Sequence, residues 1–197
     1  MSNKRIIAGV DEVGRGCLAG PVFSAAVILN KSIDKKEIKD SKKISFEKRI
    51  LLAKYIKKNS IYALGIASID EINEINILNA SLLSMQRALS KLKLTPSLAY
   101  VDGLFIPINT NIKCKAIIKG DEKITCISAA SIIAKTARDL FMIKLAKRYP
   151  KYHWHKNFGY GTPDHLNGLK KYGITKYHRK KFKPVHNILS LRTRETQ

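Results

Sequence analysis

Two adjacent acids at the end of an apolar run constrain this chain more than any other feature. Residues 5–10 read Arg-Ile-Ile-Ala-Gly-Val, and Asp11 and Glu12 follow them directly. We expect a buried strand that carries Asp11 to its end, at an edge of a sheet. Successive strand residues point to opposite faces, so both acids reach one site only if the backbone turns sharply there. The alternative is a loop with a solvated acidic pair.

Glycines after the acids permit such a turn. Gly14 and Gly16 flank Arg15, and glycine lets the main chain approach a ligand closely, with amides available to a phosphate or a hydroxyl. Arg15 adds a planar guanidinium that binds oxyanions through two hydrogen bonds. A Gly-Arg-Gly sequence by itself is weak evidence, so its meaning depends on the rest of the chain.

Acids follow short apolar runs at two further places. The run 97–101 ends in Asp102, and the run 114–118 is followed closely by Asp121. If the three strands are neighbours, four carboxylates collect where they cannot all stay ionised without cations. Carboxylate oxygens suit Mg²⁺ or Mn²⁺, and such clusters hold two ions about 3.5 to 4 Å apart for phosphodiester chemistry. The four acids are Asp11, Glu12, Asp102 and Asp121.

The last two acids have a simpler explanation when each is considered alone. Asp102 precedes a glycine and Asp121 follows one, and aspartate beside glycine is typical of turns. A metal site is favoured only when the acids after all three apolar runs are considered together.

An excess of basic residues indicates a polyanionic partner. The chain has 37 Lys and Arg against 15 Asp and Glu, a formal net charge of +22. Nucleic acid is therefore the leading candidate. Ribosomal and membrane-surface proteins share this balance, and a lysine-favouring genome contributes to it, so charge only supports the argument. The 197 residues suit one domain, and 45% hydrophobic content excludes wholesale disorder.

Several other kinds of chemistry receive no support from the sequence. Three cysteines, at positions 17, 114 and 126, lack the spacing of a zinc site or a disulfide framework, and the five histidines show no zinc-ligand spacing. We expect reduced thiols. No P-loop and no nucleophile motif is present, which disfavours a covalent mechanism. With no signal-peptide pattern and no apolar stretch of roughly 20 residues, we expect a cytoplasmic protein that does not enter a membrane.

Hydrophobic periodicity predicts an α/β protein. The expected strands cover residues 5–10, 22–29, 61–67, 97–101 and 114–118, the second antiparallel to the first. The expected helices begin after a Ser45 cap, run from 68 or 70 to a stop at Thr95-Pro96, cover 127–148, and run from 163 or 164 to 169.

The end of the chain differs in character from the rest. From residue 149 onward, aromatic side chains alternate with His, Lys and Arg. We therefore divide the chain into a catalytic core, 1–148, and a helical, aromatic and basic C-terminal segment, 149–197, packed on it. Trp154, Phe158 and Tyr160 serve either the packing of this segment or a platform for nucleic acid.

Seven motifs in a fixed order resemble the bacterial ribonuclease HII family over about residues 5–185. They are GVDEVGRG at 9–16, AGPV at 19–22, DSKK at 40–43, YVDG at 100–103, KGD at 119–121, SAASIIAK at 128–135 and GYGT at 159–162. Several unrelated stretches in the right order are far more specific than one motif.

The resemblance implies a ribonuclease H-like fold, with a five-stranded mixed sheet flanked by helices. It assigns catalysis and metal binding to the four acids named above, with Asp11 as the ligand shared by two Mn²⁺ or Mg²⁺ ions. It also implies that the glycine loop and Tyr160 recognise the 2′-hydroxyl at an RNA–DNA junction, the group that distinguishes RNA from DNA. Lys42, Lys43 and the basic tail would bind phosphates without sequence choice. The glycine loop consists of Gly14, Arg15 and Gly16.

The implied reaction is hydrolysis of the RNA strand of RNA/DNA hybrids, with nicking on the 5′ side of ribonucleotides embedded in duplex DNA. Water attacks with the help of two metal ions, leaving a 3′-hydroxyl and a 5′-phosphate. The implied partners are these duplexes, and we expect a monomer. Arg15 in place of lysine, and the lack of an additional N-terminal domain, favour type HII over the related HIII class. Glu122 adds a charge beside Asp121 where relatives often have a small residue.

Two rival functions remain open on the residues. Another nuclease of the ribonuclease H-like superfamily would use the same acids, although the combination of the Gly-Arg-Gly loop with Tyr160 argues against it. A non-catalytic basic RNA-binding protein explains the charge but not the acids after three apolar runs, and it predicts no metal dependence.

Overall fold

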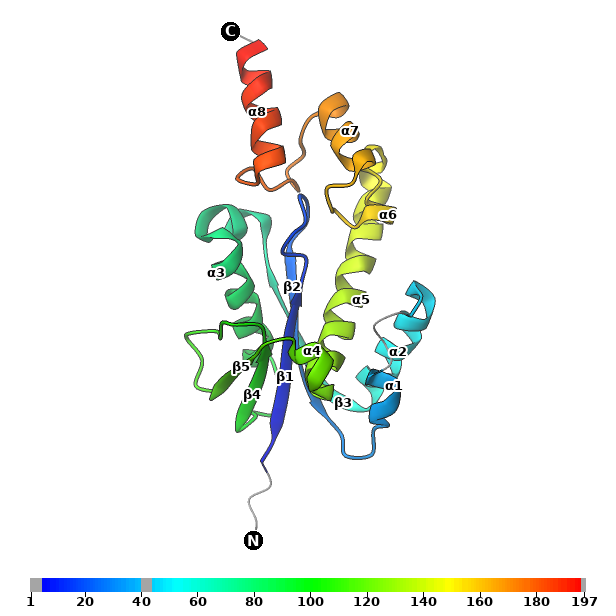
Figure 1. Ribbon diagram of the computed structural model, residues 1–197, viewed down its shortest axis with the longest axis vertical. Coiled ribbons are helices and arrows are strands. Elements are labelled where there is room, and N and C mark those ends of the chain that lie inside the picture. The colour runs from blue at the N-terminus through cyan, green and yellow to red at the C-terminus, as the bar shows by residue number, and fades with distance from the viewer. Residues whose placement is uncertain (1–4, 40–43, 196–197) are drawn as a thin grey trace.

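A five-stranded sheet in the order β3-β2-β1-β4-β5 forms the centre of the molecule (Figure 1). β1 is antiparallel to β2 and parallel to β4, so the sheet is mixed, as the resemblance implies. The computed structural model describes residues 5–39 and 44–195. The strands are β1 (Ile7–Val13), β2 (Val22–Leu29), β3 (Ser60–Ala67), β4 (Leu98–Asp102) and β5 (Cys114–Ile117).

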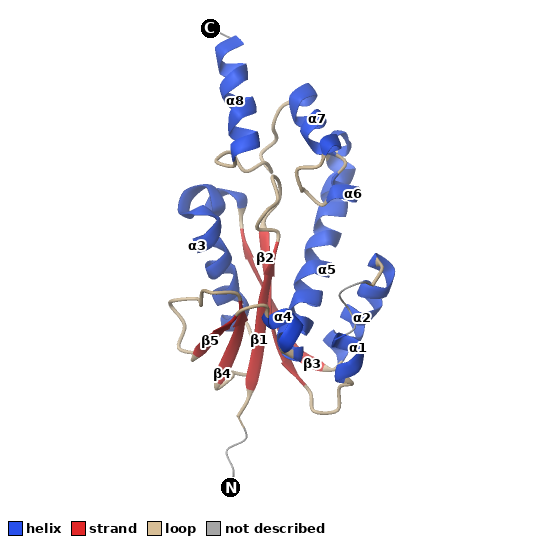
Figure 2. Ribbon diagram, viewed as in Figure 1, coloured by secondary structure: helices blue, strands red, loops and turns tan. Residues whose placement is uncertain are grey.

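Helices cover both faces of the sheet, because neighbouring residues of a strand point to opposite sides. Ala25 of β2 packs in a hydrophobic cluster with α5 (Thr125–Arg148). The next residue, Ala26, packs in a second cluster with α3 (Ile69–Ser90). Figure 2 shows the sheet between these two long helices.

Two glycines allow the long helices to approach the sheet closely. A Cβ atom on Gly9 of β1 would lie 2.1 Å from the backbone carbon of Cys126 in α5. A Cβ atom on Gly65 of β3 would lie 1.9 Å from the carbonyl oxygen of Ser84 in α3. Any side chain at either position would push a helix away from the sheet.

The helix starts predicted from serine are confirmed. The Ser45 hydroxyl accepts a hydrogen bond from the amide of Lys48 at the start of α2 (Phe46–Lys58). Ser68 and Glu71 form a reciprocal capping box at the start of α3. Such caps satisfy amides that have no partner within the helix.

Helix α3 contains a break that the sequence pattern did not predict. Asn76 has a φ of 69° and a ψ of 169°, outside the helical region. Its side-chain oxygen accepts hydrogen bonds from the amides of Leu78 and Asn79. Asn76 therefore restarts the helix in the manner of an N-cap.

The placement of the acids on strand ends was wrong in two respects. β1 does not end at Asp11, because its antiparallel pairing with β2 continues to the pair of Val13 with Phe23. β5 ends at Ile117, and Asp121 lies in a short helix, α4, instead of closing that strand. The other elements missed are α1 (Lys35–Lys39), a 3₁₀ turn (Pro150–Tyr152), α6 (Trp154–Asn157) and α8 (Lys183–Glu195), and α4 covers Gly120–Lys123.

The C-terminal segment shares a hydrophobic core with the end of α5. Trp154, Leu169 and Val185 pack in one cluster with Met142 of α5 and Leu18 of the loop after β1. This cluster joins the segment to the body of the fold, and the division at residue 148 stays a prediction. The predicted short helix is α7 (Pro163–Tyr172). Within the described residues, none of the helices has the length and apolar character needed to cross a membrane.

Candidate active site

Three of the predicted acids meet where the pairing of β1 with β4 ends. The last pair in this parallel ladder joins Val10 to Val101, so Asp11 and Asp102 follow at equivalent positions. The Asp11 side chain is buried, and burial raises its pKa well above the usual value, with the charges of Glu12 and Asp102 adding to the effect. This end of the sheet therefore concentrates negative charge in a poorly hydrated place.

Each of the three acids has one oxygen that the protein itself holds. An oxygen of Asp11 accepts from the amide of Glu12 at 2.7 Å, and one of Asp102 accepts from the amide of Gly120 at 2.6 Å. An oxygen of Glu12 accepts from the Arg15 guanidinium at 3.1 Å. These bonds fix the orientation of the carboxylates.

The second oxygen of Glu12, Oε2, is buried without a hydrogen-bond partner in the described part of the protein. Burial also raises the pKa of Glu12, against the opposing effect of Arg15. A buried carboxylate oxygen without a donor is costly unless a ligand binds it.

Asp121 lies beside Asp102 but faces a different space. Its amide donates to Asp102 at 3.4 Å, and the residue lines a cavity of about 320 Å³ together with Arg49, Ser131 and Lys135. Ser131 also makes a side-chain hydrogen bond to Asp11. One serine thus connects the cavity of Asp121 with the most buried of the four acids.

These residues fit a divalent cation. Hard oxygen ligands are what Mg²⁺ and Mn²⁺ prefer, and Glu12 Oε2 is a buried oxygen in need of a positive partner. Burial is the main cause of the raised pKa of Asp11, and the neighbouring charges of Glu12 and Asp102, which a cation would balance, raise it further. Among the described residues, no three His, Cys, Asp or Glu side chains already form a finished metal site.

The Gly-Arg-Gly loop lies on two buried arginines that sequence reasoning did not single out for a role. Arg179 donates to the carbonyl oxygens of Gly14 at 2.6 Å, Arg15 at 2.8 Å and Gly20 at 2.8 Å. Arg138 donates to the carbonyl oxygens of Ala19, Pro21 and Phe158 at 2.8–3.0 Å. The two guanidiniums together hold the loop between β1 and β2, and we call them the arginine clamp.

The clamp has no acidic partner among the described residues. Both arginines are fully buried, and burial lowers the pKa of Arg179 to about 9, which leaves it charged at neutral pH. A sequence signal existed for Arg138 alone, since it interrupts the apolar stripe of α5 between Ala134 and Met142. Arg179 stands in a run of basic residues and gave no such signal.

Tyr160 lies against the Gly-Arg-Gly loop, as the resemblance implies. A Cβ atom on Gly16 would lie 4.0 Å from the Tyr160 ring, and Tyr160 shares a side-chain hydrogen bond with buried Cys17. Burial raises the pKa of the Tyr160 hydroxyl, so it stays protonated at neutral pH. The Tyr160 residue remains partly exposed.

A buried pair of histidines holds the backbone at Tyr160. His165 Nδ1 donates to the carbonyl oxygen of Tyr160 at 2.8 Å, while His165 Nε2 accepts from Trp154 at 3.0 Å. His178 lies 3.1 Å from the same nitrogen and accepts the amide of Thr175 on its other nitrogen. Trp154 is fully buried, so it belongs to packing and not to a nucleic-acid platform.

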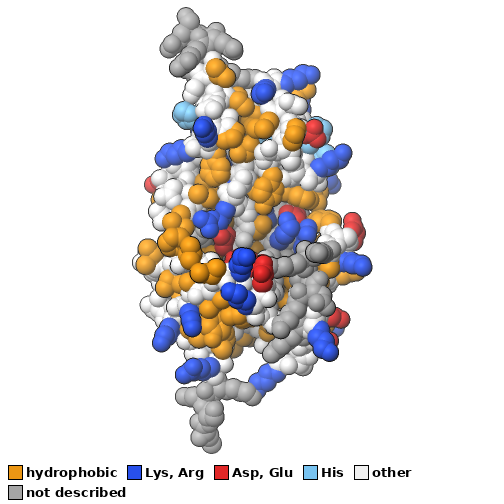
Figure 3. Space-filling model, in the orientation of Figure 1, with side chains coloured by type: hydrophobic (Ala, Val, Ile, Leu, Met, Phe, Trp, Pro, Cys, Tyr) orange, Lys and Arg blue, Asp and Glu red, His pale blue; other side chains and the backbone are white. Residues whose placement is uncertain are grey.

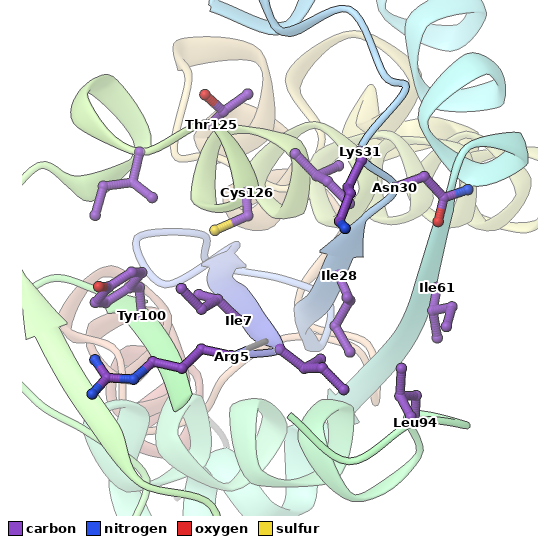
Figure 4. Close-up of a pocket in the computed structure, with 13 residues that line it drawn as sticks. Arg5, Ile7, Ile28, Asn30, Lys31, Ile61, Leu94, Tyr100, Thr125 and Cys126 are labelled. Atoms are coloured by element: carbon purple, nitrogen blue, oxygen red, sulfur yellow. The ribbon is translucent and has the colours of Figure 1, made fainter. Parts of the chain in front are cut away.

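Two predicted substrate residues, Lys42 and Lys43, lie outside the described residues. A cavity of about 530 Å³ also lies away from the acids, at the start of β1 (Figure 4). Arg5, Ile28, Tyr100 and Cys126 line it, and none of its described lining residues is acidic. This cavity therefore has no part in the acid site.

Comparisons with known proteins show to which family the chain belongs. The sequence model of the family described as Ribonuclease HII matches residues 8–185. The chain is 60% identical to ribonuclease HII of Pelagibacter ubique, covering 94% of this chain and 100% of that protein. It is 48% identical to ribonuclease HII of Neisseria meningitidis serogroup B, covering 94% and 96%.

Solved structures show the same fold. The crystal structure of ribonuclease H2 from Pyrococcus horikoshii superposes with a TM-score of 0.79 at 26% identity, over 94% of this chain and 97% of that one. A Bst ribonuclease HIII in complex with Mn²⁺ superposes with a TM-score of 0.77 at 18% identity, over 96% of this chain and 71% of that one.

Proposed function

The chain belongs to the ribonuclease HII family, and we propose that it nicks duplex DNA on the 5′ side of embedded ribonucleotides. It is a ribonuclease H, an endonuclease that acts on RNA/DNA. The observation that carries the finer proposal is the contact between the Gly-Arg-Gly loop and Tyr160, directly beside Asp11, Glu12 and Asp102. Recognition and hydrolysis would then share one site.

We propose Asp11, Glu12 and Asp102 as the residues that hold two Mn²⁺ or Mg²⁺ ions, with Asp121 completing the set from α4. When bound, such ions supply an activated water and positive charge for the departing 3′ oxygen. The support is the chemistry of the donors and the buried Glu12 oxygen without a partner. A 3′-hydroxyl and a 5′-phosphate would be the products.

The residues of the chain itself orient the proposed metal ligands. Asp11 is held by the amide of Glu12 and by Ser131, which fixes the direction in which its carboxylate faces. The amide of Gly120 holds Asp102 in the same way. Carboxylates that are already oriented lose little freedom when they bind a ligand.

Recognition of the ribonucleotide is proposed for Gly14, Arg15, Gly16 and Tyr160. The 2′-hydroxyl donates and accepts hydrogen bonds, and backbone groups of a glycine loop reach it without obstruction by side chains. The partly exposed Tyr160 ring would stack near the following deoxyribose. Lys42, Lys43 and the basic tail would contact phosphates, which adds affinity but no sequence choice.

The test is cleavage of an end-labelled DNA duplex with one ribonucleotide, in Mg²⁺, Mn²⁺ or EDTA, beside an RNA/DNA hybrid and an all-DNA duplex. We expect metal-dependent nicking 5′ to the ribonucleotide, lost in Asp11→Asn and Asp102→Asn. Glu74→Gln, which alters an exposed acid on α3, is the matched control and should keep full activity.

Tyr160→Ala then separates junction recognition from hydrolysis. We expect it to lose more activity on the single ribonucleotide than on the long hybrid. Cleavage of the hybrid without nicking at the single ribonucleotide would refute the finer proposal while leaving the ribonuclease H activity in place.

A further inference from the structure

An exposed apolar loop follows directly after Asp102. Leu104, Phe105, Ile106 and Ile108 leave 69%, 52%, 41% and 75% of their surfaces exposed. Single exposed hydrophobic residues are common, but four within five positions form a contiguous patch, which usually marks a binding surface. Figure 3 shows hydrophobic side chains gathered at the left of the view, over the connection between β4 and β5. We call residues 104–108 the apolar loop.

The fold holds the apolar loop at both ends. The amide of Gly103 donates to the carbonyl oxygen of Ile117 at 3.0 Å, and Gln86 of α3 donates to the carbonyl oxygen of Asn109 at 2.6 Å. Pro107 within the loop is buried. The four large side chains are thus presented to solvent from an anchored backbone.

The apolar loop also forms part of the rim of the acid site. Leu104 and Phe105 line a small cavity together with Glu12, Arg15 and Asp102. A duplex that brings a phosphate to these carboxylates must lie across the same rim. Because the apolar loop is continuous with the rim of the acid site, nucleic acid is the occupant that this position favours.

The segment that carries the apolar loop is basic between the flanking acids Asp102 and Asp121. Residues 103–120 contain no acid and three lysines, at positions 113, 115 and 119. Proteins that act on duplexes insert apolar side chains against sugars and between base steps, and aromatic rings stack on any base. A sequence-independent contact of this kind suits an enzyme that selects sugars and not bases.

We propose that the apolar loop is a duplex contact, with the Phe105 ring inserted against a base step and Leu104 packed against the sugars beside the scissile phosphate. The inference rests on the proposed function for the position of the duplex. The aromatic ring supplies affinity, and the neighbouring acids carry out hydrolysis.

The test uses binding of a fluorescent RNA/DNA hybrid in EDTA, where no cleavage occurs. We expect Phe105→Ser to weaken the Kd by about 5- to 100-fold, the range for loss of one stacked base. Phe105→Trp should restore tight binding. Leu94→Ser, which alters an exposed residue on the wall of the cavity at the start of β1, should bind as the unmodified protein does. All three variants should unfold near the same temperature, because these side chains are exposed.

A 2-aminopurine base beside the ribonucleotide reports insertion directly. We expect its fluorescence to rise on binding and to rise less with Phe105→Ser. Unchanged hybrid affinity in Phe105→Ser, with an unchanged unfolding temperature, would overturn the inference and leave the apolar loop to a protein partner. The binding assay uses the hybrid, so its outcome is separate from failure to nick single ribonucleotides.

Discussion

The acids at the end of β1 and the arginine clamp beneath the next loop are both buried charges, and the fold treats them in opposite ways. Arg138 and Arg179 each donate to three backbone carbonyl oxygens, so their hydrogen-bonding capacity is largely used. Asp11, Glu12 and Asp102 face one another, and an oxygen of Glu12 has no donor in the described part of the chain.

The difference separates charges that the fold itself neutralises from charges for which we propose a bound cation. A buried cation surrounded by oriented carbonyl dipoles stabilises the native structure, and removing it leaves several acceptors unpaired. A cluster of like charges destabilises the native structure until a counter-charge arrives. We therefore expect mutations in the two regions to change stability in opposite directions.

The largest effect is expected from Asp11→Asn. Cleavage should fall by about three orders of magnitude or more, since loss of a metal ligand forfeits several kcal/mol of transition-state stabilisation. In EDTA, the free energy of unfolding should rise by about 1–3 kcal/mol, because an uncompensated buried charge is gone. Thermal denaturation beside the Glu74→Gln control measures this. A less stable Asp11→Asn protein would contradict the comparison.

Next in size is Arg179→Met, which should lower the free energy of unfolding by about 3–5 kcal/mol. Three buried carbonyl oxygens, those of Gly14, Arg15 and Gly20, would lose a charged donor. Lys180→Met alters the exposed neighbour and should change little. Chemical denaturation compares the two. Equal stability of both variants would show that the clamp is dispensable.

Addition of Mn²⁺ should raise the stability of the unmodified protein by about 2.7 kcal/mol at 100 times its Kd. The rise should be much smaller in Asp11→Asn and unchanged in Glu74→Gln, which alters an exposed acid on α3. A thermal shift series against metal concentration measures it without any substrate. An equal shift in Asp11→Asn would place the ion elsewhere.

The last effect depends on pH and concerns the buried histidines. Burial lowers the pKa of His178 to about 3, and it lowers that of His165 as well. The unfolded chain takes up protons below about pH 6.5 while the folded protein does not, so their contribution to stability is present above that pH and is lost towards pH 3. Each histidine lowers the free energy of unfolding by up to about 1.4 kcal/mol for every pH unit below about pH 6.5.

Urea denaturation between pH 7 and pH 4 tests the histidine effect. His178→Gln should flatten the pH dependence, whereas His155→Gln, at an exposed position, should leave it unchanged. If the stability of the unmodified protein and of both variants changed with pH at the same rate, the acid sensitivity would belong to other groups.

The sequence predicted those elements whose residues carry their own signal. The strand over 22–29 was found with its bounds because it is a continuous apolar run between turns. The helix start at Ser45 was found because a serine cap is local chemistry, and the start of α3, expected at 68 or 70, was found from its apolar periodicity. The acids Asp11 and Asp102 were brought together correctly because neighbouring parallel strands place equivalent residues side by side.

Other features depended on contacts between distant segments. Lys119 adopts a φ of 53° before α4, and nothing in its own sequence requires this, so Asp121 was placed on a strand end. Arg179 finds its carbonyl partners about 160 residues earlier in the chain. α8 is strongly basic and was hidden in the general excess of lysine and arginine.

The arginine clamp also has a consequence for the outer surface of the loop it holds. No peptide bond in the described structure is cis, and in a trans peptide the N–H points opposite to the C=O. Because Arg179 draws the carbonyl oxygens of Gly14 and Arg15 inward, the amides of Arg15 and Gly16 point outward. The surface proposed to meet the substrate is thus polarised in advance, and docking of an oxygen-rich strand there would need no reorientation of the backbone.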